Sequence, residues 1–109
     1  MDCIFCRIVA GEIPAKKRFE NDDCIIIEDI SPMAPAHLLV IPKQHYASMA
    51  EAASDPALLG ALYAGAADFA KDIGLESYRL VANTGPDAGQ TVFHLHIHIL
   101  GGKKLGGFA

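Results

Sequence analysis

The sequence has no tryptophan, only three cysteines and no apolar stretch approaching the roughly 20 residues of a membrane-spanning helix. Its longest run of basic residues is the triplet at 16–18 and its net charge is −4, so it predicts neither a nucleic-acid-binding surface nor a membrane partner. Residues 1–3 lack the basic and then apolar pattern of a secretion signal. An odd number of cysteines without an export signal favours a reducing, cytoplasmic environment over a disulfide framework.

The residues that are present predict one α+β domain over 1–109. Apolar residues make up 51% of the chain and charged residues 20%, which is typical of a domain with a packed core. Ser54, Asp55 and Pro56 form a strong helix start before apolar residues at helical spacing. We therefore expect a mainly antiparallel sheet of about five strands, one long helix and a short N-terminal helix. The expected strands are 17–20, 24–28, 37–41, 78–82 and 92–100, and the expected helices are 3–10 (capped by Asp2), one or two turns within 45–53, and 56–73.

The most informative feature is a row of three histidines at alternate positions, His94, His96 and His98. A β-strand has a side-chain period of two, so the apolar residues between them can face the core while the three imidazoles line the opposite face. A solvated strand face that happens to carry histidine is the alternative interpretation. Because imidazole serves as nucleophile, proton carrier and metal ligand, we interpret the row as a functional site.

The segment 94–100, His-Leu-His-Ile-His-Ile-Leu, resembles the signature of the histidine triad (HIT) family of nucleotide hydrolases and transferases. The resemblance covers residues 3–102 and is to the Hint branch, carried also by segments 4–8, 11–15, 29–32, 35–37, 40–43 and 89–93. It implies a HIT-like fold, a homodimer and an enzyme that cleaves purine nucleoside 5′-phosphoramidates or acyl-nucleotides. The nucleotidyl-transferase branch has glutamine where this chain has His98, so the resemblance favours hydrolysis.

The resemblance places the nucleophile at His96, between His94 and His98, and a supporting histidine at His37 on a neighbouring strand. A neutral imidazole is a good nucleophile if a nearby backbone carbonyl holds Nδ1–H and leaves the Nε2 lone pair free. Attack on the α-phosphorus would release the amine and leave a covalent nucleotidyl-histidine for water to resolve. His98, on the same face, could donate a proton to the leaving group or the bridging atom. This mechanism requires no metal.

Nucleotide contacts are also implied by the resemblance. The phosphate falls at the loop before the histidines, where Gly89 lets the backbone come close. Asp29 resembles a ribose-binding carboxylate, and Thr91 stands where serine is common in this branch. Without the resemblance, Asn83 and Gln90 fit ordinary turn chemistry and the apolar residues fit plain core. The implied phosphate contacts are Asn83, Gly89, Gln90 and Thr91, and the implied purine contacts are Ile4, Phe5, Ile8, Ile27 and Ile30.

Cys3 and Cys6 form a Cys-x-x-Cys pair in the expected first helix. Two thiols alone are weak grounds for a metal site, because structural zinc needs four ligands. Some bacterial members of the family complete such a pair with two histidines, and the resemblance implies His45 and His94 here. We therefore expect a structural zinc ion that is separate from the catalyst. A redox-active pair is the weaker alternative, because no strand precedes the cysteines.

Two further functions stay open from the sequence. His94, His96 and His98 could together bind a catalytic metal, because His-x-His on a strand is also a common ligand arrangement. A non-catalytic nucleotide-binding scaffold could retain the pocket without turnover. We place both after the covalent mechanism.

Overall fold

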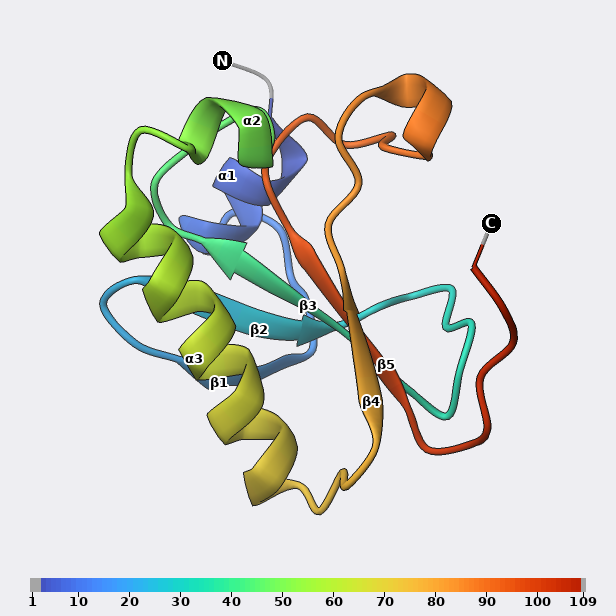
Figure 1. Ribbon diagram of the computed structural model, residues 1–109. Helices are drawn as coiled ribbons and strands as arrows, with labels where there is room; N and C mark the ends of the chain where they lie inside the picture. Colours follow the sequence, from blue (N-terminus) through green and yellow to red (C-terminus); the bar gives the residue numbers. More distant parts are fainter. Residues whose placement is uncertain (1–2, 109) are drawn as a thin grey trace.

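The computed structural model describes residues 3–108, and the predicted Asp2 cap lies outside them. Five strands form one sheet, with a long helix across one of its faces and a short helix on the other (Figure 1). This arrangement confirms the predicted α+β architecture. In chain order the elements are α1 (Ile4–Val9), β1 (Lys17–Glu20), β2 (Cys24–Glu28), β3 (Ala36–Pro42), α2 (Met49–Ala52), α3 (Pro56–Asp72), β4 (Tyr78–Val81), the 3₁₀ turn η1 (Pro86–Ala88) and β5 (Ile97–Gly101).

The sheet is antiparallel throughout, in the order β1-β2-β3-β5-β4. Alternate residues of each strand face opposite sides, so the sheet separates two apolar clusters. One cluster, under α3, contains Ile26, Val40 and Ile99. The other, under α1, contains Ile25, Leu39 and other residues of β2 and β3. The pairing of β3 with β5 places Leu39 opposite His98, so the histidines emerge on the α1 side.

The predicted start of α3 is confirmed in detail. The Asp55 carboxylate accepts a hydrogen bond from the backbone N–H of Leu58 at 3.2 Å, and Pro56 occupies the first turn. The buried stripe of α3 lies on the sheet and includes Leu62, Ala66 and Phe69. Within residues 3–108, no helix has the length and apolar character needed to cross a bilayer.

Most of the predicted boundaries that differ from the structure do so by one residue, and the start of the final strand differs by five. The first helix begins at Ile4 rather than at Cys3, because Cys3 is its N-cap and its Sγ accepts a hydrogen bond from the N–H of Cys6. The final strand begins at Ile97 rather than at 92. Its ladder with β3 ends at the pair Val40–Ile97. Beyond that pair Pro42 has no N–H to donate, and its carbonyl accepts a hydrogen bond from a histidine ring instead.

We expect Leu62→Ala to lower the free energy of unfolding by about 2–5 kcal/mol, because Leu62 is fully buried between α3 and the sheet. Asp68→Ala on the exposed side of the same helix is the control and should change it by less than about 0.5 kcal/mol. Urea unfolding of both variants provides the measurement. Equal losses would contradict the packing described for α3.

Candidate active site

A cavity of about 950 Å³ opens between α1, the end of β2 and the central strands β3 and β5. Its walls are mostly apolar, and two histidines, two acidic residues and one lysine also line it, which is the usual composition of a small-molecule site. The predicted residues that line it are Ile4, Phe5, Ile8, Ile27, Asp29, Ile30, Thr91, His96 and His98. The sequence analysis did not single out Leu39 and Val92, which also line it, although Leu39 shares a strand face with His37.

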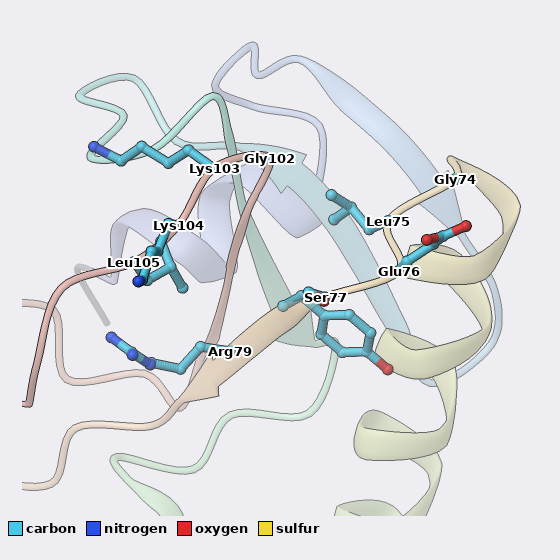
Figure 2. A pocket seen from close by; sticks show the side chains of 10 residues that line it. Gly74, Leu75, Glu76, Ser77, Arg79, Gly102, Lys103, Lys104 and Leu105 are labelled. Carbon is cyan, nitrogen blue, oxygen red and sulfur yellow. The ribbon is translucent and has the colours of Figure 1, made fainter.

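A second hollow, of about 690 Å³, lies where the loop before β4 meets the segment after β5. Figure 2 shows its charged side chains, with Arg79 from β4 and Lys103 and Lys104 from the C-terminal segment. No histidine or cysteine lines it. The imidazoles therefore gather at the first cavity.

His96 is held in one tautomer by the backbone. Its Nδ1–H donates to the carbonyl oxygen of His94 at 2.7 Å, and a carbonyl can only accept. In the neutral ring Nε2 therefore carries a free lone pair. The Phe5 ring meets His96 edge to face, with centroids 5.0 Å apart, and fixes the plane of the imidazole. This is the arrangement that the nucleophile hypothesis requires.

His98 is held in the opposite tautomer through His37. The backbone N–H of Met33 donates to His37 Nδ1 at 3.0 Å, so a neutral His37 carries its proton on Nε2. That Nε2–H donates to His98 Nδ1 at 2.9 Å. Neutral His98 is then left with its proton on Nε2, as a hydrogen-bond donor. Met33 acts through its backbone, so no side-chain pattern in the sequence could have revealed it.

Burial in this apolar wall, together with the neighbouring His96 and His37 rings, lowers the pKa of His98 to about 4. His98 therefore stays neutral at physiological pH in the free protein. Asp29 stands beside this pair, with one carboxylate oxygen 3.4 Å from His37 Nε2 and the other accepting from the N–H of Ser31 at 2.7 Å.

His94 lies on the α1 side of the sheet, as the alternation of the strand predicts, but unlike His96 and His98 it does not line the cavity. Its side chain is fully buried and lies with Cys3, Cys6 and His45, and all four candidate ligand atoms lie within 4.8 Å of one another. The two Nδ1 atoms are 3.1 Å apart, and His94 Nδ1 lies 3.4 Å from Cys3 Sγ. Tetrahedral zinc with ordinary bond lengths separates its ligands by roughly 3.3–3.8 Å, so this set fits the ion.

The tautomer of His94 also suits a metal ligand. Its Nε2–H donates to the carbonyl of Pro42 at 2.8 Å, so Nδ1 presents a lone pair to the cluster. Burial lowers the pKa of His94, which keeps the ring neutral as metal binding requires.

A second group, Asp29 with His37 and His98, is equally compact but does not fit a metal, because the Met33 N–H makes His37 Nε2 a donor. Among the described residues, the ligand atoms of His94, His96 and His98 do not form a group. The structure therefore gives the catalytic-metal alternative no ligand set.

The structure does not bring Asn83, Gly89 or Gln90 to the cavity wall. Gln90 is buried, and its side-chain oxygen accepts from the N–H of Gly85 at 2.9 Å. Its amide nitrogen donates to the carbonyls of Ala47 and Val92. Gln90 thus holds the loop that carries Thr91, while Gly89 adopts the positive φ of 97° that glycine favours.

Known proteins resemble this chain over nearly its whole length. A family model described as the HIT domain matches residues 10–105. A HIT-like protein of Synechococcus elongatus is 51% identical over 106 residues, covering 95% of this chain and 93% of its own.

Solved structures agree with this family. A histidine triad protein from Clostridium difficile is 41% identical, with a TM-score of 0.95 over 100% of this chain and 97% of its own. A HIT family hydrolase from Clostridium thermocellum is 43% identical, with a TM-score of 0.92 over 98% and 96%. A zinc-bound histidine triad family protein from Mycobacterium smegmatis is 31% identical, with a TM-score of 0.84 over 94% and 76%. The chain therefore belongs to the HIT domain family.

Proposed function

We propose that this protein is a nucleotide hydrolase of the Hint branch that cleaves purine nucleoside 5′-phosphoramidates or acyl-nucleotides through a covalent nucleotidyl-His96 intermediate. The observation that carries the proposal is the 2.7 Å bond from His96 Nδ1–H to the His94 carbonyl, which leaves Nε2 as a nucleophile on the cavity wall. The C. thermocellum relative, described as a hydrolase, supports the same reaction class.

In the first step, the His96 Nε2 lone pair forms a bond to the α-phosphorus and the bond from phosphorus to the amine breaks. The leaving nitrogen keeps that electron pair and takes one proton from solvent, because the cavity is open to water. His96 becomes a positively charged imidazolium, still donating Nδ1–H to the His94 carbonyl, which stabilises the charge. In the second step, water bonds to phosphorus, the P–Nε2 bond breaks with its electron pair returning to Nε2, and the attacking water releases one proton to solvent.

We assign His98 as a neutral hydrogen-bond donor in both steps. Its Nε2–H, imposed by His37, can donate to a phosphate oxygen or to the leaving nitrogen as negative charge develops there. Such a preset donor needs no reorganisation during the reaction.

The walls of the cavity suit a purine nucleoside. Ile4, Phe5 and Ile27 offer an apolar slot for the base. We assign Asp29 to the ribose hydroxyls and Thr91 to the phosphate, and we assign Asn83, Gly89 and Gln90 to the loop that supports the phosphate side. The adenine or guanine base is not distinguished by these groups.

We propose that Cys3, Cys6, His45 and His94 hold a structural zinc ion, supported by their spacing and by the zinc-bound relative. When bound, zinc would tie α1 to the segment before β5, with no part in the phosphorus chemistry.

We further propose a cytoplasmic homodimer. Free thiols at all three cysteines support the location. The dimer is supported by the edge strand β4 and by the exposed side chains of Tyr63 in α3 and Phe93 before β5.

We expect His96→Ala to lower kcat/KM for an adenosine 5′-phosphoramidate by about a thousandfold or more, because no other free imidazole lone pair faces the cavity wall. The affinity for AMP, measured by calorimetry, is the control and should change only a few-fold. A wild type without turnover would support the scaffold alternative, and equal turnover by both proteins would exclude His96 as the nucleophile.

We expect stability to fall on acidification, partly through His98. The folded ring takes up a proton near pH 4 and the unfolded ring near its ordinary pKa of 6.5, so between these values the unfolded state binds more protons. Between about pH 7 and about pH 4.5, the free energy of unfolding of His98→Gln should therefore fall by about 2 kcal/mol less than that of the wild type. Urea unfolding at both pH values compares the two proteins, and identical losses would contradict the neutral state of His98.

A further inference from the structure

We propose that the cluster of Cys3, Cys6, His45 and His94 is a positioning device for catalysis, so that metal occupancy sets the nucleophile and the base pocket together. Cys3, Cys6 and His45 are then positioning residues that act through His94 and α1. The inference rests on the proposed function, but its structural consequences can be measured without turnover.

The first connection runs through His94. Both ring nitrogens are committed, Nδ1 to the cluster and Nε2–H to the Pro42 carbonyl, and the side chain is fully buried. The carbonyl of the same residue holds His96 Nδ1–H. A ring pinned on both sides cannot turn without moving the backbone that carries this carbonyl. The position of the nucleophile therefore depends on whether the cluster holds His94.

The second connection runs through α1. Cys3 caps this six-residue helix and Cys6 lies in its first turn, so two of the four ligands belong to it. Phe5 lies between them in the sequence, and its ring contacts both His94 and His96, with centroids 5.9 and 5.0 Å apart. A helix this short is not stable by itself, so its place depends on tertiary links. The cluster therefore also fixes the wall built from Ile4, Phe5 and Ile8.

Without a cation, only hydrogen bonds hold the four groups together. His45 Nδ1–H can donate to the lone pair of His94 Nδ1 at 3.1 Å, and Cys6 Sγ lies 3.3 Å from His45 Nδ1. Because sulfur is a weak hydrogen-bond partner, these contacts hold the cluster less firmly than four bonds to a zinc ion would. We expect the metal-free cluster to spread, which loosens both connections.

The test compares zinc-loaded and chelator-stripped wild type with three variants. His45→Ala removes a ligand that touches neither His96 nor the cavity wall, His45→Cys restores a zinc ligand, and Cys24→Ala removes the one cysteine outside the cluster. Four quantities are measured: bound zinc, the ¹⁵N shifts of the His96 ring, the affinity for AMP, and the rate at which labelled nucleotide joins the protein in a single turnover.

We expect the loaded wild type, His45→Cys and Cys24→Ala to bind one zinc and to show a single Nδ1–H tautomer at His96. His45→Ala and the stripped wild type should show averaged ring shifts, about tenfold weaker AMP binding and at least about tenfold slower nucleotide transfer.

An unchanged His96 tautomer and AMP affinity without metal would overturn the proposal and leave the cluster a purely structural site. Failure of zinc to bind, or loss of the whole fold on stripping, would overturn it as well. If the ring shifts depend on metal but labelled nucleotide joins none of the proteins, the proposed function fails while the coupling between the cluster and His96 stands.

Discussion

The proposed chemistry of this protein depends on one hydrogen bond, from the His96 ring to the backbone carbonyl two residues earlier. A neutral imidazole can carry its proton on either ring nitrogen, so its surroundings decide which nitrogen has the free lone pair. A carbonyl accepts and never donates, so it leaves the Nε2 lone pair unprotonated and facing the cavity. The fold makes this possible because regular pairing of β5 begins only at Ile97. The backbone before Ile97 can therefore take a conformation in which the His96 ring reaches the His94 carbonyl.

The same rule assigns the other histidines. A carbonyl partner on Pro42 makes His94 an electron-pair donor toward the cysteines, whereas an amide partner on Met33 makes His37 a hydrogen donor toward His98. In the proposed mechanism, backbone groups with opposite polarity thus give chemically identical side chains the roles of nucleophile, metal ligand and hydrogen-bond donor. Burial reinforces this by lowering the pKa of His94 and His98, so that neither ring is charged before substrate arrives.

The sequence predicted the layout of the fold and most of the cavity wall. Alternation placed Leu95, Ile97 and Ile99 in the core, and turn residues located the first four strands to within one residue. The period of two could not separate His94 from its neighbours, because the break before Ile97 depends on Pro42 in another strand. The roles of Met33 and Pro42 could not be predicted either, because both residues act through backbone groups, which side-chain patterns do not reveal. Gln90 was predicted from resemblance, and its buried bonds to Gly85 and Ala47 depend on tertiary contacts.

The most direct test of this account is to quench the enzyme within the first turnover of a labelled adenosine phosphoramidate and map the label by peptide mass spectrometry. We predict one nucleotidyl group per active site, attached at Nε2 of His96, that appears before free AMP and decays with the rate of its release. Turnover without label on the protein, or with the label on another residue, would contradict the account.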